Sequence, residues 1–434
     1  MLKLPAADCA DDRSVFRRHH HSEMVSLLLS GLVLLAAECL PAAEADAKSL
    51  FQAVQRDLES GEKPVKVACF GDSITGVYYH SGSQRAWCDM LGLALEQAFP
   101  QADVEMVNAG ISGHTTVNAL GRIEKDVIAR KPRLTVVMFG MNDVTRVPIA
   151  QYEANLRKIC SDCLAAGSAV VLCTPNNVYD NGARPNGKLD QFSDVVRRVA
   201  KETNVPLVDF FRLWTDYRKA DELAWIQLMS DSIHPNMNGH RLFAEQIVQE
   251  AFGLKVSLND VPPPADGLQK TLAQLRAGKP VSMIAMPPWG GLVARRLRHH
   301  FPQAEISETV WEVEGRTAAD IAKISTTVRS RKPTLVVVGL PQPAGLEDPA
   351  GLHRFWEGLL NLSFSFGSRP WDVVPVQPPV ASTDPAVQES RQQLMRVFLL
   401  GKDVEYIEVQ EAASAESQRN AWVDRQVERA VESD

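Results

Sequence analysis

The sequence predicts an α/β protein whose first domain is a three-layer α/β/α sandwich around a five-stranded parallel sheet. Between residues 65 and 253, short apolar runs alternate with helical patterns. Strands that alternate with helices pair in parallel through right-handed crossovers. The apolar runs are also nearly continuous, which is typical of strands that are covered by helices on both faces.

Five strands and five helices are expected in this region. The expected strands are the apolar runs at 65–70, 104–108, 134–139, 169–174 and 205–210. The expected helices have apolar residues at the three- and four-residue spacing of a helix face, near 86–98, 116–130, 151–166, 188–203 and 239–252. Strand and helix therefore alternate along the whole region, which gives the predicted catalytic domain the bounds 46–253.

The N-terminal segment, residues 1–45, has the order of a secretory signal. Arginines between residues 13 and 18 precede an apolar run at 24–37, and small residues follow up to Ala45. This order predicts export to the periplasm or the extracellular space, with cleavage after Ala45. The apolar run is shorter than the roughly 20 residues of a membrane span. We therefore expect no stable membrane span after cleavage, and an uncleaved membrane anchor is the alternative.

Composition excludes several classes of function. The formal net charge is −7, with 45% hydrophobic and 23% charged residues, as in ordinary soluble globular proteins. This mild acidity argues against a nucleic-acid partner, which favours a basic face. Five cysteines remain beyond residue 45, and an odd number excludes a fully paired disulfide framework in a monomer. The single Cys160-x-x-Cys163 motif is weak evidence for a metal or redox site.

The second half of the chain repeats landmarks of the first half. A proline-rich linker at 254–268 separates the halves. The repeated landmarks keep their order: Lys-Pro-Val at 63–65 and 279–281, Phe-Pro-Gln-Ala at 99–102 and 301–304, and Arg-Lys-Pro at 130–132 and 331–333. Such internal similarity predicts a second, degenerate α/β domain at 269–410. A charged helical tail at 411–434 follows, which we expect to be a solvated terminal helix.

The second copy is shorter than the first at one place. The spacing between equivalent landmarks falls from 216 to 202 residues, so the second copy lacks 14 residues between the first two landmarks. In the first copy this stretch contains residues 77–88.

Polar and glycine-rich segments follow the expected strands of the first domain. The first strand ends in Gly-Asp-Ser at 71–73, the second in residues 108–113, and the third in Gly-Met-Asn-Asp at 140–143. A further segment, Asp-Ser-Ile-His-Pro at 231–235, comes after the fifth strand. Because ligands bind outside the carboxyl ends of the strands in an open α/β sheet, these segments should converge on one crevice.

The residue types in this crevice fit acyl transfer. Ser73 is a nucleophile only if a base takes its proton, and His234 is the expected base. Asp231, three residues before His234, is placed to hold the other ring nitrogen. The oxyanion needs fixed donors, for which we expect the backbone N–H groups of Ser73 and Gly110 and the side-chain amide of Asn142. This chemistry requires no metal or cofactor.

The four segments GDSI, NAGISG, GMND and DSIHP, in this order, resemble the signature blocks of the SGNH hydrolase superfamily, the GDSL-type esterases and lipases. The resemblance covers residues 65–250 and implies a flavodoxin-like sheet. It implies the roles given above for Ser73, Gly110, Asn142, Asp231 and His234.

The second copy departs from these blocks. Trp289 stands at the position of Ser73, Glu312 at that of Gly110, and Pro343 near that of Asn142. No Asp-x-x-His sequence occurs after residue 255. We therefore expect one active site, in the first domain.

The predicted function is hydrolysis of carboxylic esters through an acyl-enzyme, with a small-molecule or saccharide ester as substrate. A carbohydrate O-acetylesterase or short-chain esterase is favoured. Two alternatives stay open: a lysophospholipase or thioesterase, and a polysaccharide-binding protein whose second half is non-catalytic. Four residues, Tyr78, Tyr79, His80 and Trp87, either line the acyl or sugar site or pack under a loop.

Overall fold

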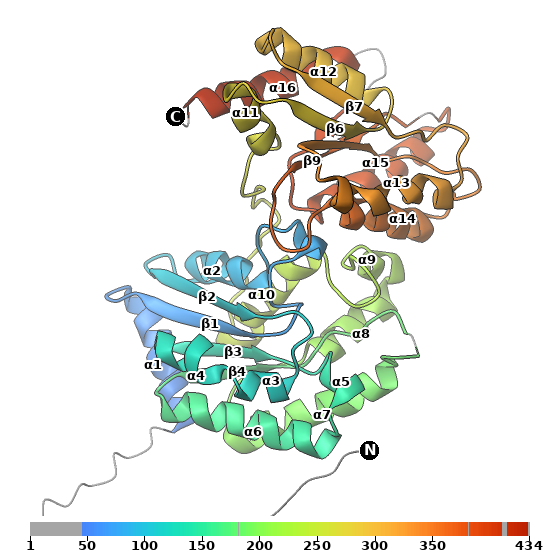
Figure 1. Cartoon of the computed structure of the whole chain (residues 1–434). Helices are drawn as coiled ribbons and strands as arrows, with labels where there is room; N and C mark the ends of the chain where they lie inside the picture. Colours follow the sequence, from blue (N-terminus) through green and yellow to red (C-terminus); the bar gives the residue numbers. More distant parts are fainter. Residues whose placement is uncertain (1–45, 181, 381, 410–414, 433–434) are drawn as a thin grey trace, which may run out of the picture. The chain divides into compact units, whose positions relative to one another are not determined.

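The computed structural model describes residues 46–180, 182–380, 382–409 and 415–432 (Figure 1). The predicted secretory signal at 1–45 lies outside the described residues, so export stays a prediction. No described helix combines the length and the apolar character needed to cross a bilayer.

The first sheet confirms the predicted α/β class. Its strands run parallel in the order β2-β1-β3-β4-β5. They are β1 (Val65–Gly71), β2 (Val104–Gly110), β3 (Leu134–Met138), β4 (Ala169–Cys173) and β5 (Leu207–Val208). Strand β1 lies between β2 and β3, with Gly71 level with both Gly110 and Met138. The segments that follow these three strands therefore begin at the same edge of the sheet.

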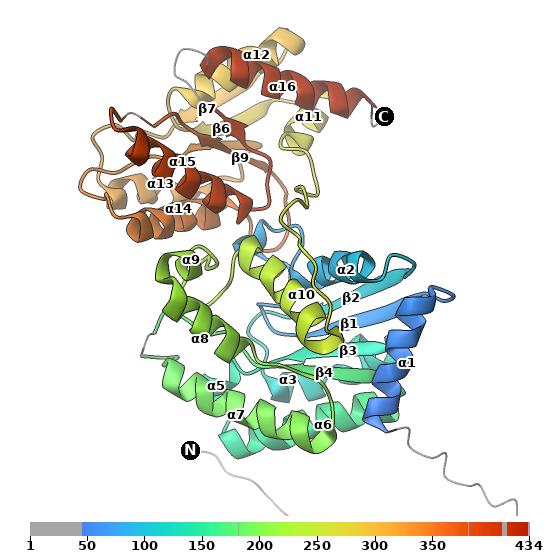
Figure 2. The ribbon, with the colours of Figure 1, turned by 180° about the vertical axis from the view of Figure 1, so that it is seen from behind.

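Helices cover both faces of this sheet. Helices α2 (Trp87–Ala98) and α10 (Met237–Phe252) lie on one face, and α6 (Ile149–Ala165) and α7 (Asn186–Thr203) lie on the other (Figures 1 and 2). All four were expected within a few residues of these bounds. Helix α1 (Ala47–Ser60), which the sequence analysis did not predict, precedes β1.

Two predicted elements differ from the structure. The single helix expected at 116–130 is three short pieces, α3 (Thr116–Leu120), α4 (Ile123–Asp126) and a 3₁₀ turn, because α3 ends at Gly121. The strand expected at 205–210 is shorter, because Asp209 caps a new helix: its carboxylate accepts the N–H of Arg212 at 3.2 Å. An aspartate at this position is a strong helix start. Helices α8 (Phe210–Ala220) and α9 (Glu222–Ile226) follow.

The second half contains a second five-stranded parallel sheet with the same strand order, β7-β6-β8-β9-β10. Its strands are β6 (Val281–Ala285), β7 (Ile306–Val310), β8 (Leu335–Gly339), β9 (Asp372–Gln377) and β10 (Ile407–Glu408). Its helices are α11 (Gln269–Arg276), α12 (Trp289–His300), α13 (Ala318–Arg331), α14 (Pro349–Ser363), α15 (Pro385–Leu400) and α16 (Ala415–Glu432). An internal duplication would produce this order, and the duplication and the domain bounds stay predictions.

Each sheet has its own hydrophobic core. The expectation of a solvated terminal helix is wrong for α16, because Trp422 and Val423 are buried in the second core. Asp424 on the same helix pairs with Arg296 of α12 at 2.6 Å. The helix therefore packs against the second core and is not solvated all round.

The stretch 77–88, for which the sequence predicts no counterpart in the second half, contacts that half. Ser83 Oγ donates to the carbonyl of Ser365 at 3.1 Å. Arg85 binds the carboxylate of Asp403 through two nitrogens, at 2.6 and 2.8 Å, and Arg241 reaches the same carboxylate at 3.0 Å. Bidentate arginine–carboxylate pairs are strong and directional. This stretch thus joins the two halves.

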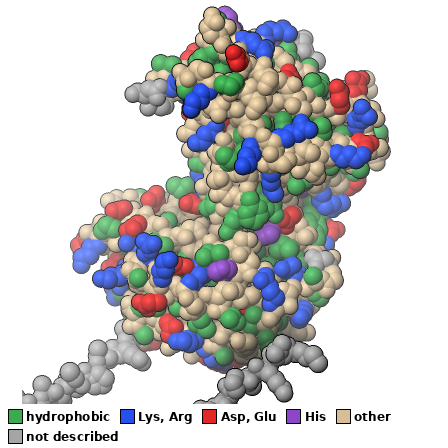
Figure 3. Space-filling model, in the orientation of Figure 1, with side chains coloured by type: hydrophobic (Ala, Val, Ile, Leu, Met, Phe, Trp, Pro, Cys, Tyr) green, Lys and Arg blue, Asp and Glu red, His purple; other side chains and the backbone are tan. Residues whose placement is uncertain are grey.

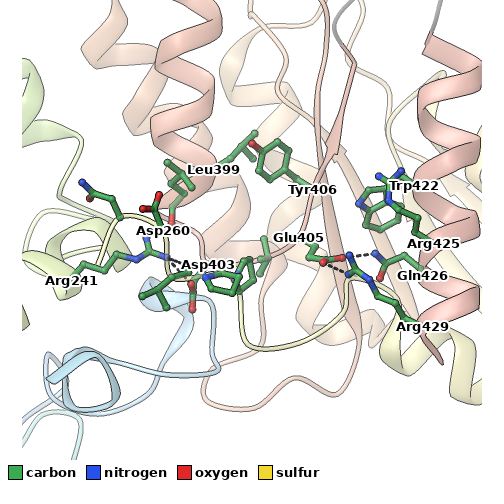
Figure 4. Close-up of a pocket in the computed structure, with 16 residues that line it drawn as sticks. Arg241, Asp260, Leu399, Asp403, Glu405, Tyr406, Trp422, Arg425, Gln426 and Arg429 are labelled. Carbon is green, nitrogen blue, oxygen red and sulfur yellow. Dashed lines mark hydrogen bonds and ion pairs between the residues drawn. The ribbon is translucent and has the colours of Figure 1, made fainter. Parts of the chain in front are cut away.

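A cavity of about 350 Å³ lies beside this junction (Figure 4). The Arg241–Asp403 pair lines one end, and Glu405 binds Arg429 and Gln426 at the other. None of the predicted catalytic residues lines it, so it is separate from the predicted active site.

The five described cysteines are buried free thiols. Burial raises the pKa of Cys160 and Cys163 to about 12, which keeps them as unreactive thiols. On the face seen in Figure 3, basic and acidic side chains are interspersed.

Candidate active site

The predicted nucleophile follows β1 directly, after a closely packed glycine. Ser73 comes two residues after Gly71, the last residue of the strand. A Cβ on Gly71 would lie 2.0 Å from Thr75 Oγ1 and 2.8 Å from the carbonyl oxygen of Met138. Glycine is favoured here because the backbone of β3 and the side chain of Thr75 approach so closely that a larger residue would collide with them. Ser73 is buried, with 8% of its surface exposed.

Ser73, His234 and Asp231 form a hydrogen-bonded chain. Ser73 Oγ lies 2.9 Å from His234 Nε2. His234 Nδ1 lies 2.8 Å from Asp231 Oδ2 and 3.1 Å from Oδ1. These distances let the imidazole accept the serine proton on one nitrogen while the carboxylate holds the proton on the other. The structure thus brings all three predicted residues together.

The loop that carries Asp231 and His234 is held by its own backbone. Asp231 Oδ1 accepts the N–H groups of Ile233 and His234, both at 2.8 Å. The N–H of Ser230 donates to the carbonyl of His234 at 2.8 Å. Burial alone would raise the pKa of Asp231, but the charge of His234 and these hydrogen bonds lower it below its ordinary value. Asp231 is therefore a carboxylate at neutral pH.

A stack of three imidazoles supports His234. The ring of His80 lies 4.6 Å from that of His234 at an interplanar angle of 6°, and His240 stacks on His80 at 5.6 Å. His80 Nε2–H donates to the carbonyl of Ser73 at 3.0 Å. Burial lowers the pKa of His80 well below its ordinary value and that of His240 to about 3. Both supporting rings are therefore neutral. His80 was expected either to line the site or to pack under a loop, and its ring stacks on that of His234.

Gly110 is wrong as an oxyanion donor. Its N–H already donates to Asn108 Oδ1 at 2.9 Å. Its lack of a side chain has another reason, because a Cβ would lie 2.2 Å from the nitrogen of Gly76. Gly113, three residues later, has a φ of +75°, and within the described residues its N–H has no hydrogen-bond partner. Gly113 is the better donor.

Asn142 has an amide whose orientation is fixed. Its Oδ1 accepts from Arg146 at 3.0 Å and from Arg184 at 3.4 Å, so Nδ2 must point the other way. Nδ2 donates to the carbonyl of His114, the neighbour of Gly113, at 3.1 Å. A longer contact of 3.3 Å joins it to Asp72, whose pKa burial raises to about 6. In this state Nδ2 makes two hydrogen bonds, so an oxyanion at this place would replace the longer one, to Asp72.

Comparison with known proteins identifies the family. Residues 69–242 match the model of the GDSL-like lipase/acylhydrolase family. An acetylxylan esterase of Geobacillus stearothermophilus is 32% identical over 171 residues, which are 36% of this chain and 76% of that protein. The chain belongs to the GDSL-like lipase/acylhydrolase family, within the SGNH hydrolase superfamily.

Other relatives share the same region. The thioesterase 1/protease 1/lysophospholipase L1 of Escherichia coli (strain K12) is 32% identical over 181 residues, covering 42% of this chain and 80% of that protein. An arylesterase of Vibrio mimicus is 30% identical over 186 residues, covering 43% and 87%. This GDSL-type protein is accordingly a carboxylic ester hydrolase. The family match ends at residue 242, before the second half begins.

The aromatic residues predicted to line the site separate into two groups. In this GDSL hydrolase the Tyr79 hydroxyl donates to Asp231 Oδ2 at 3.2 Å, and the Tyr78 hydroxyl accepts the N–H of Ser112 at 2.9 Å. Trp87 is wrong as a substrate residue, because it is 1% exposed and belongs to the first core. It begins α2 with its ring turned inward, so it has no surface to offer a ligand.

One aromatic residue near the site comes from the second half. Phe366 is 56% exposed, and its ring lies 5.5 Å from Tyr78 and 5.8 Å from Tyr79. The guanidinium of Arg329 lies 5.2 Å above the ring of Tyr79. In Figure 3, hydrophobic side chains gather near the middle of the face, next to a histidine. No motif marks Phe366 in the sequence, because its position follows from contact between the halves.

Among the described residues, no group of three His, Cys, Asp or Glu side chains is arranged to hold a metal ion.

Proposed function

We propose that the chain hydrolyses short acyl esters of carbohydrates through an acyl-enzyme on Ser73. The observation that carries this proposal is the hydrogen-bonded chain from Ser73 Oγ through His234 to Asp231, with steps of 2.9 and 2.8 Å.

The reaction uses these groups in order. His234 Nε2 accepts the proton of Ser73 Oγ as the oxygen attacks the acyl carbonyl. The N–H groups of Ser73 and Gly113 and the amide of Asn142 stabilise the oxyanion, and each such donor typically contributes about 10²–10³ in rate. His234 then protonates the leaving alcohol. Water, deprotonated by His234, releases the acyl group and restores Ser73.

Two considerations favour a saccharide ester. A relative that is 32% identical bears the name acetylxylan esterase. The rings of Tyr78, Tyr79 and Phe366 contact one another and form an aromatic surface. This surface lies next to the catalytic histidine, because the ring of Tyr79 is 6.5 Å from that of His234. Aromatic side chains with a polar tip suit ligands that have both apolar faces and hydroxyl groups.

Hydrolysis of lysophospholipids or thioesters is the second candidate, because another 32% identical relative is named for those activities. A polysaccharide-binding role of the second half is compatible with either.

A substrate panel separates the candidates. With purified protein, kcat/KM should be highest for acetyl esters, should fall along a series of chromogenic esters from acetate to decanoate, and should be measurable on acetylated xylo-oligosaccharides. A maximum at long acyl chains, or faster turnover of lysophospholipid than of acetylated saccharide, would contradict the carbohydrate assignment.

Phe366 should matter for the saccharide and not for the chemistry. Phe366→Ala should raise KM for acetylated xylo-oligosaccharides about 5-fold, since an aromatic contact contributes about 1 kcal/mol. It should leave kcat on a chromogenic acetate unchanged, because the side chain does not touch the reacting groups. Tyr217→Ala, which removes another exposed aromatic residue, at 39% exposure, is the matched control. An equal KM in Phe366→Ala and the parent protein would exclude this surface from saccharide binding.

A further inference from the structure

A buried polar cluster of the second half lies against the loop that carries Asp231 and His234. The cluster consists of Glu357 and Asn361 on α14 and Lys402, which follows α15. Glu357 and Lys402 form an ion pair and are 2% and 0% exposed. Asn361 Oδ1 accepts a hydrogen bond from Lys402 Nζ at 2.8 Å. We call these three residues the anchor cluster.

The anchor cluster holds the residue before Asp231. Ser230 is 2% exposed, and its Oγ lies 3.2 Å from Glu357 Oε2 and 3.0 Å from Asn361 Oδ1. Asn361 Nδ2 also donates to the carbonyl of Ser230 at 2.9 Å. Both the side chain and the backbone of Ser230 are therefore bound.

The same cluster holds the other end of the loop. Asn236, two residues after His234, is fully buried, and its Nδ2 donates to Glu357 Oε1 at 3.0 Å. The N–H of Met237 donates to the carbonyl of Gly401 at 2.8 Å, next to Lys402. Glu357 thus binds Ser230 with one oxygen and Asn236 with the other, and Asp231 and His234 lie between these two residues.

The charge of Lys402 also interacts with the carboxylate of Asp231. Burial lowers the pKa of Lys402, and the charges of Glu357 and Asp231 oppose that shift. A buried ion pair stabilises a fold little compared with apolar packing of the same volume. Its geometric requirements, on the other hand, are strict, because every buried donor and acceptor needs its partner.

We propose that Glu357, Asn361 and Lys402 are positioning residues, through which the second half holds Asp231 and His234 in register with Ser73. This inference rests on the proposed function of those three residues in ester hydrolysis. It assigns a role to the second half, which completes the site of the first half.

The experiment measures kcat per active site, counted by titration with a fluorophosphonate. Asn361→Leu and Glu357→Gln should each lower kcat per titrated site about 10-fold or more, with KM for a chromogenic acetate changed less than 2-fold, because small displacements of catalytic groups cost up to about 10² in rate. The rate constant for phosphonylation of Ser73 should fall in parallel. Ser230→Ala, which removes one hydroxyl and keeps the backbone contact, should lower kcat about 3-fold and serves if a larger change prevents folding.

The double variant Glu357→Gln/Lys402→Met separates the effect of the hydrogen bonds that hold the loop from the effect of the two buried charges. The glutamine carbonyl can still accept from Asn236, its amide can donate to Ser230, and no unpaired charge is left. We expect kcat per titrated site to recover to within about 3-fold of the parent protein.

Arg296→Met is the matched control, because it breaks the Arg296–Asp424 pair inside the second half, at 2.6 Å. It should lower Tm without changing kcat per titrated site. If the anchor variants behave like this control, with fewer sites but an unchanged kcat per site, the positioning role is refuted. Failure of the proposed function is distinct: the parent protein would then lack ester turnover or would carry no label on Ser73.

Discussion

Ser73→Ala should lower kcat for a short-chain chromogenic ester by on the order of 10⁵- to 10⁶-fold, the loss typical of a serine nucleophile in a hydrogen-bonded triad. The alanine has no oxygen to attack the carbonyl, whereas the donors of the oxyanion site stay in place. Substrate should therefore still bind with little change in affinity, and steady-state kinetics on the purified variant measures the loss.

The neighbouring Ser232→Ala is the control for this substitution. Ser232 is exposed and lies in the same loop as Asp231 and His234, and its carbonyl, which the substitution keeps, accepts the N–H of Tyr179 at 3.1 Å. It should retain nearly full activity. Undiminished turnover in Ser73→Ala would mean that another group attacks the ester.

Asp231→Asn should lower kcat about 10⁴-fold, because an amide in place of the carboxylate favours the wrong tautomer of the histidine. In the parent protein the N–H groups of Ile233 and His234 lie 2.8 Å from Asp231 Oδ1. The asparagine side chain keeps an oxygen that can accept these two hydrogen bonds. The loop should therefore fold, and the loss should appear in kcat at unchanged secondary structure by circular dichroism.

Asp231→Asn should also lower the free energy of unfolding at neutral pH. The folded pKa of Asp231 lies below its ordinary value, so its carboxylate stabilises the fold at neutral pH, and this contribution is lost as the pH falls through the folded pKa. Asp216→Asn, at an exposed aspartate that pairs with Lys219, should change neither kcat nor the free energy of unfolding. A loss of less than 10-fold in Asp231→Asn would indicate that another acid orients His234.

The sheet and its main helices were predictable because they depend on local pattern. Continuous apolar runs mark β1, β3 and β4, and helical spacing marks α2, α6, α7 and α10. The predicted bounds were wrong where a single polar residue determines the end of a strand. The carboxylate of Asp209 starts α8 and shortens β5, although the apolar residues around it read as one strand. The charged residues of the C-terminal tail predict a solvated helix. Trp422 and Val423, however, bury one side of α16 in the second core.

The site was predictable to the extent that its residues occur in short segments at strand ends. Ser73, Asn142, Asp231 and His234 meet this condition. Gly110 was chosen in place of Gly113 because a pattern does not show that the Asn108 side chain has already taken the Gly110 N–H. Phe366 and the anchor cluster were not predicted for a different reason: each acts through contacts between segments that are distant in sequence.

The most direct test of a single acyl-enzyme site is intact-mass and peptide mass spectrometry after reaction with a fluorophosphonate. We predict one adduct per chain, located on Ser73, appearing in proportion to the loss of esterase activity and absent from Ser73→Ala. Complete inhibition with the adduct on another residue, or labelled Ser73 in a fully active enzyme, would contradict the assignment of Ser73 as the nucleophile.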